Sequence, residues 1–218
     1  MSQLVFKFPF KIKYDEHDFY VSSNNFKAYK LIESWPNWPG KSLNVFGDKG
    51  SGKTHLSKIL EKKIKKVKII EAQKINDQII SKLNDLDCLI IDNFNNDINE
   101  KLLYSIINQS KQLENYLVIN SLEPIKKTSF NLKDLQSRIN SLIDIGIELP
   151  TDDLLKVIIS KSFSDKQVNI NPKISEYIIK NVDRSYEKIF KFIKDVDDLS
   201  LSSGKSININ LIKKVLNQ

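Results

Sequence analysis

The sequence predicts an α/β fold in which a five-stranded parallel sheet is covered by helices on both faces and followed by a small all-helical unit. Three observations support this prediction. Five apolar runs of strand length alternate with segments of helical periodicity. The first of these runs leads into a glycine-rich loop and a helix, and past Pro150 only the helical periodicity continues. Strands that alternate with helices favour a parallel sheet that is buried on both faces.

The expected elements follow one another in a regular order along the chain. Strands are expected at 42–47 (SLNVFG), 67–70 (VKII), 88–92 (CLIID), 116–120 (YLVIN) and 142–149 (LIDIGIEL). A helix is expected from about Thr54 to Ile64, and helical spacing of apolar residues also marks 73–83, 99–113 and 132–142. The residues before the first strand show no regular pattern and are expected to be irregular.

The segment after Pro150 is expected to form the separate helical unit. Thr151 and Asp152 are candidate caps of its first helix, and Asn171 is a candidate cap of the second, with Pro172 at the first helical position. The segments SYEKIFKFIKDVDDLSL and NLIKKVLNQ complete the unit. We therefore place a domain boundary near Pro150.

Composition narrows the class of protein. The chain has 218 residues, which is long enough to bury a sizeable core. Its formal charge of +7 is spread along a lysine-rich chain, so the charge alone is weak evidence for a nucleic-acid partner. The single cysteine, Cys88, excludes an intramolecular disulfide and favours a reducing compartment. No apolar run reaches the length of a signal peptide or a membrane span, and we expect a soluble cytoplasmic protein.

The glycine-rich loop GDKGSGKT fits the pattern G-x-x-x-x-G-K-[ST]. Such glycines let backbone N–H groups converge on the α- and β-phosphates of a nucleotide at a helix N-terminus. The candidate cofactor-binding residues are Gly47, Gly50, Ser51, Gly52, Lys53, Thr54 and His55. Lys53 is expected to reach the β- and γ-phosphates, and Thr54 together with Asp92 is expected to hold Mg²⁺. No other metal site is predicted.

Four motifs in one order carry a resemblance to a known family: GDKGSGKTHL, LIIDNF, YLVINSLEP and LKDLQSRI. Together they resemble the AAA+ domain of the DnaA replication-initiator family, and more closely its Hda-type regulatory relatives. The resemblance covers about His17 to Gln218. It implies a P-loop αβα sandwich at 17–150 and a helical lid domain at 151–218.

Both ends of the chain bear on the choice between initiator and regulator. Initiators carry a DNA-binding domain beyond the lid, whereas this sequence stops at Gln218, so direct DNA binding is expected to be weak or absent. The segment QLVFKF resembles the hexapeptide that docks replication proteins on the sliding clamp, and 1–16 is read as a clamp-binding segment. Its contact residues would be Gln3, Leu4, Phe6 and Phe8. The alternative is that the alternating apolar residues form a half-buried edge strand.

The resemblance assigns further roles around the γ-phosphate. Arg138 falls where the family carries an arginine finger, which points to the nucleotide of a neighbouring subunit. Asn120 stands at the sensor I position, at the end of the fourth strand. Asn93 replaces the hydrolytic carboxylate, and an amide cannot accept a proton from water. Glu187 maps onto the sensor II arginine, and the possible substitutes are Arg184, one helical turn earlier on the same face, or Lys188 after a small rotation.

These residues predict a regulator of replication initiation. Groups that hold the α- and β-phosphates are kept, whereas those that cleave the γ-phosphate are changed, so we expect a protein that holds ADP or ATP with Mg²⁺ and hydrolyses it feebly. Its expected partners are a DnaA-type initiator, whose hydrolysis it stimulates, the sliding clamp, and possible further copies of itself. The alternatives are a helicase-loader-like ATPase, which Asn93 disfavours, and a nucleotide-gated DNA-binding protein, whose affinity for DNA would depend strongly on salt.

Overall fold

The computed structural model describes residues 18–95 and 97–216. The chain divides into two compact units between Glu148 and Leu149. We call the unit before this point the sheet domain and the unit after it the helical domain.

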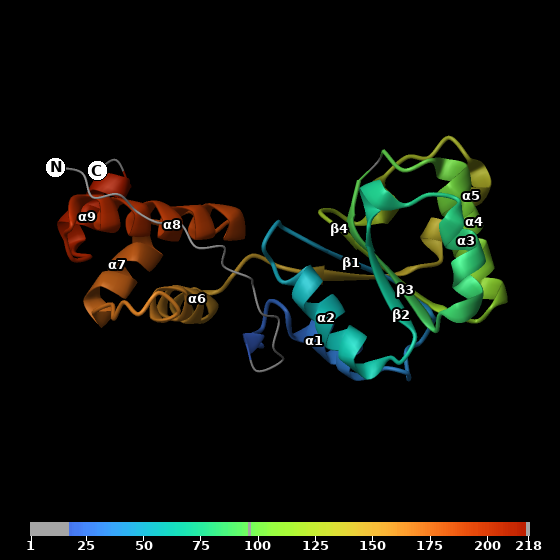
Figure 1. Cartoon of the computed structure of the whole chain (residues 1–218), viewed down its shortest axis with the longest axis horizontal. Coiled ribbons are helices and arrows are strands. Elements are labelled where there is room, and N and C mark those ends of the chain that lie inside the picture. The colour runs from blue at the N-terminus through green and yellow to red at the C-terminus, as the bar shows by residue number, and fades with distance from the viewer. Residues whose placement is uncertain (1–17, 96, 217–218) are drawn as a thin grey trace. The chain divides into compact units, whose positions relative to one another are not determined.

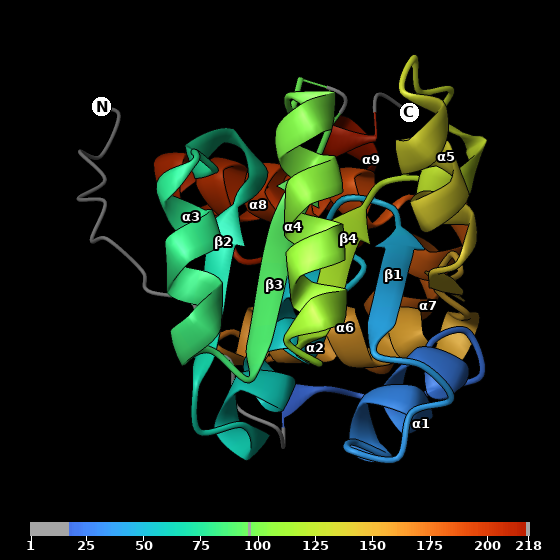
Figure 2. The same cartoon turned by 90° about the vertical axis from the view of Figure 1, so that its right-hand side faces the viewer.

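The sheet domain is built on five parallel strands in the order β2-β3-β4-β1-β5. The strands are β1 (Ser42–Gly47), β2 (Val67–Glu71), β3 (Cys88–Phe94), β4 (Tyr116–Ser121) and β5 (Ile143–Ile147). Helices α1 (Phe26–Glu33) and α2 (Lys53–Lys63) cover one face, and α3 (Gln78–Lys82), α4 (Glu100–Gln112) and α5 (Lys133–Asn140) cover the other (Figures 1 and 2). The predicted five-stranded parallel sheet with helices on both faces is confirmed.

Side chains of the central strands point alternately to the two faces of the sheet and so contribute to a separate hydrophobic core on each face. On β3, Leu89 and Ile91 pack under α3, α4 and α5, whereas Cys88 and Ile90 pack under α1 and α2. All four side chains are completely buried. Successive side chains of a strand point to opposite faces, so a central strand between two helical layers is apolar at nearly every position. The run CLII is therefore a strand buried on both sides.

Two segments differ from the sequence-based expectation. The helix expected at 73–83 is reduced to α3, with short 3-10 turns at Ala72–Lys74 and Leu83–Asp85 on either side. The chain is extended at Ile75, and the Asn76 side chain accepts a hydrogen bond from the Gln78 backbone N–H, so a local turn interrupts the helix. The segment before β1, expected to be irregular, contains α1, whose Ala28 and Ile32 are buried against the sheet.

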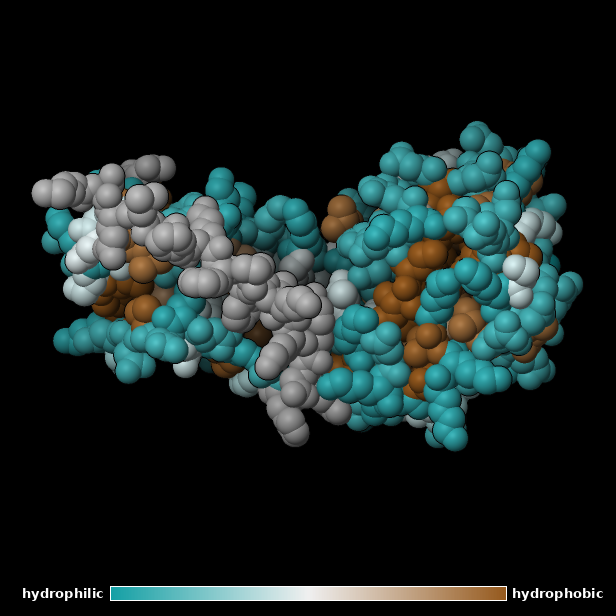
Figure 3. All heavy atoms as spheres, in the orientation of Figure 1, coloured by the Kyte–Doolittle hydropathy of each residue, from teal (hydrophilic) through white to brown (hydrophobic). Residues whose placement is uncertain are grey.

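The helical domain contains α6 (Asp152–Ser164), α7 (Pro172–Asn181), α8 (Tyr186–Ser203) and α9 (Ile209–Val215). Thr151 and Asn171 cap α6 and α7 by accepting backbone N–H groups, and Pro172 opens α7. Apolar residues of all four helices, among them the fully buried Phe163, form one core. No described helix is long and apolar enough to cross a membrane. Figure 3 shows mostly hydrophilic residues on one face of each domain, with apolar patches between them.

Candidate nucleotide-binding site

The glycine-rich loop joins the end of β1 to the start of α2. Gly50 and Gly52 have φ angles of 85° and 102°, in the region that favours glycine. At Gly47 a Cβ atom would lie 2.7 Å from the backbone oxygen of Ile147, so the approach of β5 also requires glycine there. No described side chain caps the N-terminus of α2, which begins at Lys53. The loop is thus shaped to present backbone N–H groups at a helix N-terminus, where anions bind.

Lys53 lies inside this loop. Its ammonium group donates hydrogen bonds to the backbone oxygens of Gly47 and Asp48, at 2.7 and 2.9 Å. Burial lowers the pKa of Lys53, and the charges of Asp92 and Asp48 oppose that effect. A cation that is fixed among the loop carbonyls is suited to an anionic ligand bound by the same loop.

Thr54 and Asp92, the two residues expected to hold Mg²⁺, are in contact although they lie on different elements. The Thr54 hydroxyl, at the start of α2, donates to Asp92 Oδ2 at 2.7 Å. Asp92 lies near the end of β3 with 2% of its surface exposed. A hydroxyl and a carboxylate oxygen in contact are donors of the kind that Mg²⁺ takes together with nucleotide phosphates.

Asn120, on the next strand, joins Thr54 and Asp92 in one hydrogen-bonded array of side chains. Its side-chain Nδ2 donates to Asp92 Oδ1 and to the hydroxyl of Ser57, both at 2.8 Å. In the sheet register Asn120 pairs with Val45 on β1, two residues before Gly47, where the glycine-rich loop begins. Asn120 is fully buried at the end of β4, beside the phosphate loop. One amide thereby connects β4, β3 and α2 at the carboxyl edge of the sheet.

Asn93 follows Asp92 at an irregularity in β3, where the pairing with β4 shifts between Ile91 and Phe94. Its φ of 54° lies in the left-handed region, which asparagine tolerates better than most residues. The Asn93 backbone N–H donates to Asp92 Oδ1 at 3.1 Å. Its exposed side-chain Nδ2 donates to Glu71 Oε2, at the end of β2, at 2.9 Å.

The residues present fit a bound nucleotide. Ser51 Oγ in the loop and Asn120 Oδ1 are buried polar atoms with no hydrogen-bond partner among the described residues. A buried unpaired polar atom costs about 1–3 kcal/mol, so a ligand that supplies partners is favoured. The glycine conformations, the uncapped start of α2 and the Thr54–Asp92 pair belong to the same site.

His55 and the segment before α1 meet on the other side of the loop. The Phe19 ring stacks on Tyr29 with centroids 5.7 Å apart, and it meets the edge of His55 at 5.2 Å. A Cβ atom on Gly52 would come within 3.0 Å of Phe19, so this ring lies directly against the phosphate loop. Phe19 is a neighbour of the loop that the sequence pattern did not indicate.

Arg138 lies on α5, the helix held to the core by Leu135 and Ile139. Its side chain is partly exposed, and in the part of the chain that the structure describes no carboxylate pairs with it. The carboxylate of Glu100, on α4, holds the residues just before α5 in place, because it accepts the backbone N–H groups of Asn131 and Leu132 at 3.0 and 2.8 Å.

The candidate lid residues are arranged differently from the expectation. Arg184 was expected on the same helix face as Glu187, but it precedes α8 and lies in the connection after α7. It forms an exposed ion pair with Asp152, at 2.8 Å. Glu187 lies in the first turn of α8. The candidate clamp-binding residues, Gln3, Leu4, Phe6 and Phe8, lie outside the described residues.

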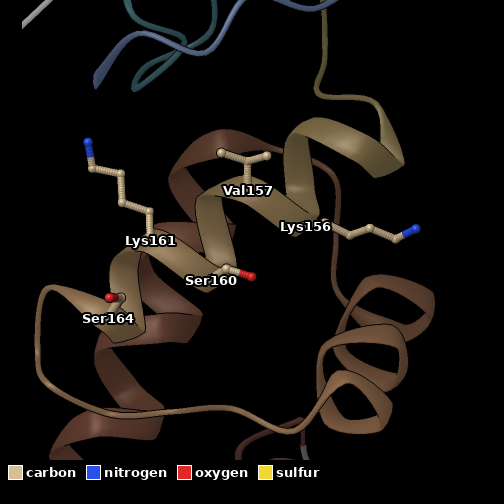
Figure 4. A pocket seen from close by; sticks show the side chains of 5 residues that line it. All are labelled: Lys156, Val157, Ser160, Lys161 and Ser164. Atoms are coloured by element: carbon tan, nitrogen blue, oxygen red, sulfur yellow. The ribbon is translucent and has the colours of Figure 1, made fainter. Parts of the chain in front are cut away.

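A shallow recess runs along one side of α6 (Figure 4). Its lining residues are Lys156, Val157, Ser160, Lys161 and Ser164. The two lysine side chains extend in opposite directions, and the recess therefore offers no converging set of polar groups.

Sequence reasoning missed two residues of the array, Ser57 and Glu71. Ser57 follows Thr54 by three positions, so helical spacing places both on one side of α2. Glu71 ends β2 and pairs with Asp92 in register. The spacing of the strands could have placed both carboxylates at one edge of the sheet, because parallel strands end on the same side.

The sheet order, the phosphate loop and the following helical domain define an AAA+ class of P-loop protein. No family model matches the chain. It is 23% identical over 233 residues to the chromosomal replication initiator protein DnaA of Buchnera aphidicola subsp. Cinara cedri, covering 94% of this chain and 53% of that protein. It is also 22% identical over 212 residues to an uncharacterized protein of Haemophilus influenzae, with 92% of each covered. The chain is a DnaA-related AAA+ protein and spans about half the length of the Buchnera relative.

Solved structures share the fold. Domain III of the Thermotoga maritima replication initiation protein DnaA gives a TM-score of 0.75 at 18% identity, covering 96% of this chain and 98% of that chain. AMPPCP-bound DnaA from Aquifex aeolicus gives 0.70 at 20% identity, covering 89% and 68%. The Thermotoga maritima RuvB Holliday junction branch migration motor gives 0.65 at 20% identity, covering 89% and 67%. At these identities the similarity establishes the fold alone.

Proposed function

We propose that the chain is a nucleotide-bound, Hda-type regulator of the DnaA initiator that acts in the cytoplasm. The observation that carries the proposal is the contrast at the carboxyl edge of the sheet. Lys53, Thr54, Asp92 and Asn120 form a complete phosphate-side array, whereas the residue after Asp92 is an amide. The site is built to hold a nucleotide and poorly equipped to cleave it.

The sheet domain holds ADP or ATP in this proposal, and the helical domain acts as the lid. Backbone N–H groups of the loop and the Lys53 ammonium bind the phosphates, and Thr54 and Asp92 hold Mg²⁺. The metal, when bound, neutralises charge on the β- and γ-phosphates. Asn120 keeps the Asp92 carboxylate oriented by donating to Oδ1 while Oδ2 accepts from Thr54. Arg184, which pairs with Asp152 in the structure, is the candidate lid cation for the nucleotide in this proposal.

Hydrolysis by the chain alone is weak because Asn93 cannot act as a general base. General-base assistance is worth about 10²- to 10⁴-fold in rate. The groups around the α- and β-phosphates are unaffected by this change, so ADP is bound at least as tightly as ATP. Titration calorimetry of both nucleotides tests this preference, with Lys53→Ala as the control that removes binding. Much tighter binding of ATP than ADP contradicts the proposal.

The regulatory step takes place in the partner. Arg138 is partly exposed and forms no ion pair with a carboxylate among the described residues, which leaves its guanidinium available to an ATP-loaded initiator. Arginine suits this role because its planar fork binds phosphate oxygens in pairs. The initiator then carries ADP, and this limits further initiation. The same surface could pair with a second copy of this chain.

The segment from Gln3 to Phe8 docks the protein on the sliding clamp in this proposal. Pull-down with purified clamp tests it, comparing the wild type with a Gln3→Ala/Phe6→Ala variant. The matched control is Lys7→Ala, which changes the same segment without removing an anchor. Docking is supported if the double variant loses binding while Lys7→Ala keeps it. Absence of clamp binding by the wild type contradicts the docking proposal.

A further inference from the structure

Glu71 is a second carboxylate at the carboxyl edge of the sheet, one strand away from Asp92. It ends β2, and its Cα atom is the register partner of the Asp92 Cα atom on β3. Neighbouring strands lie about 4.8 Å apart, so Glu71 ends at the same height as the residues that hold the nucleotide. Its side chain is exposed and is longer than that of Asp92 by one methylene group.

Asn93 connects this carboxylate to the candidate site. Its side-chain amide donates to Glu71 Oε2 at 2.9 Å, and its backbone N–H donates to Asp92 Oδ1 at 3.1 Å. The positive φ of Asn93 and the irregularity in β3 present the amide at the strand end rather than inside the sheet. A carboxylate oxygen is therefore held within one hydrogen-bond length of the position where the resemblance expects the hydrolytic acid.

We propose that Glu71 supplies the water-activating carboxylate for ATP hydrolysis by this chain and that Asn93 is the positioning residue that holds it. This inference rests on the nucleotide site proposed above and identifies the source of its residual turnover. A water oxygen forms a bond to the γ-phosphorus, the bond from that phosphorus to the β,γ-bridging oxygen breaks, and ADP leaves with the bond electrons. Glu71 accepts the proton of the water and releases it to solvent.

The same geometry predicts weak turnover. The carboxylate lies on the neighbouring strand instead of following Asp92 directly, and it is the hydrogen-bond partner of the Asn93 amide. General-base catalysis requires hydrogen-bond reach, about 2.6–3.2 Å between heavy atoms or one bridging water. A displaced base that satisfies this reach only part of the time lowers the rate without disturbing the phosphate-binding groups.

Single-turnover hydrolysis of γ-labelled ATP by the full chain tests the assignment. Glu71→Gln is expected to lower the rate by about 10²-fold or more while ATP affinity, measured by calorimetry, stays unchanged. Glu61→Gln is the matched control, because Glu61 is a surface carboxylate near the far end of α2, paired with Lys58. Glu71→Gln/Asn93→Glu moves the carboxylate onto β3 and is expected to restore or exceed the wild-type rate. Position 93 is where the resemblance expects the hydrolytic acid, so this rise is expected whatever the role of Glu71, and the rate of the single Glu71→Gln variant decides that role.

The outcomes separate this inference from the proposed function. Wild-type hydrolysis in Glu71→Gln with normal ATP binding overturns the role of Glu71 and leaves the nucleotide-bound regulator intact. Hydrolysis by the wild type that does not exceed that of Lys53→Ala also overturns it. Failure of the wild type to bind either nucleotide overturns both proposals.

Discussion

Asn120 shows how one buried side chain organises the candidate site. Its amide nitrogen donates to both Asp92 and Ser57, and the residue is completely buried. Asp92 receives hydrogen bonds from Thr54, Asn93 and Asn120, which stabilise the carboxylate in a nearly inaccessible position. The site is therefore held together by contacts between side chains as well as by the phosphate loop.

Asn120→Ala is expected to lower the free energy of unfolding of the sheet domain by about 1–3 kcal/mol, because Asp92 and Ser57 lose a buried donor. Urea unfolding followed by tryptophan fluorescence measures the change, since Trp35 and Trp38 both belong to this domain. Asn84→Ala is the control, because the Asn84 amide is exposed and bonds only locally, to the Ser81 backbone oxygen. Equal stability of Asn120→Ala and the wild type would show that the array contributes nothing to folding.

Cys88 is expected to be inert in the folded protein. Burial, followed by the charge of Asp87, raises the pKa of its thiol to about 12. Because the folded pKa lies above that of an unfolded thiol, this stabilising contribution is complete below the unfolded pKa and is lost as the pH rises towards about 12. A thiol reagent at pH 8 should label Cys88 only in denaturant. Rapid labelling of the native protein contradicts the buried position of this strand.

Helix α5 depends on a carboxylate that belongs to another helix. Glu100 accepts the backbone N–H groups of Asn131 and Leu132, immediately before α5. Leu132 is the N-cap residue, and its own side chain makes no capping hydrogen bond. The interaction resembles the part of a capping box in which a glutamate accepts the backbone N–H of the N-cap residue, here supplied by another helix. It bears on the proposed function because α5 carries Arg138, the proposed arginine finger.

Glu100→Ala is expected to increase hydrogen exchange at the Asn131 and Leu132 amides. The hydrogen bonds from these two amides lower the pKa of Glu100. The stabilising contribution is therefore present above the ordinary glutamate pKa and is lost as the pH falls through the lowered value. Exchange measured by mass spectrometry at several pH values tests both statements. Glu114→Ala is the control, and unchanged exchange in Glu100→Ala would exclude the cap.

The sequence predicted the strands more closely than the features that join them. The apolar runs at 88–92 and 116–120 located β3 and β4 because burial on both faces leaves a continuous signal. The sequence pattern did not show that β3 continues for two further residues, Asn93 and Phe94, of which Asn93 adopts a positive φ. Helix α1 was missed because only Ala28 and Ile32 of its eight residues are buried, which is too sparse a pattern.

The candidate site was predictable to the extent that it lies in contiguous motifs. The loop residues and the Thr54–Asp92 contact follow from a motif and the shared edge of parallel strands. The contact between Glu71 and Asn93 depends on which strands are neighbours, and the strand order is a property of the fold rather than of any local pattern. The position of Arg184 depended on where α8 begins, and helix boundaries are the least certain part of such predictions.

The described residues form separate hydrophobic cores. Two clusters lie on the two faces of the sheet, and a third is made only of residues of the helical domain. Phe163, with no exposed surface, lies in the third cluster. Domains with their own cores can respond separately to a core substitution.

Phe163→Ala is expected to destabilise the helical domain by about 3–5 kcal/mol, which is the usual cost of removing a buried phenylalanine ring. The unfolding transition seen by far-ultraviolet circular dichroism should shift or split, whereas tryptophan fluorescence, which reports on the sheet domain, should keep its midpoint. Val157→Ala, on the recessed side of α6, is the control. A parallel shift of both signals would show that the two domains unfold as one.

Arg138 provides the most direct test of the proposed regulatory role. ATP hydrolysis by a purified DnaA-type initiator is measured with clamp on DNA and increasing amounts of this chain. The wild type and Lys133→Ala, a control cation on the same helix, are expected to stimulate hydrolysis, whereas Arg138→Ala is expected to abolish the effect. Arginine fingers supplied in trans contribute about 10³- to 10⁵-fold to the rate in GTPases. Arg138→Lys should not restore stimulation, because lysine lacks the planar fork of arginine. Full stimulation by Arg138→Ala, with nucleotide and clamp binding intact, would contradict the account.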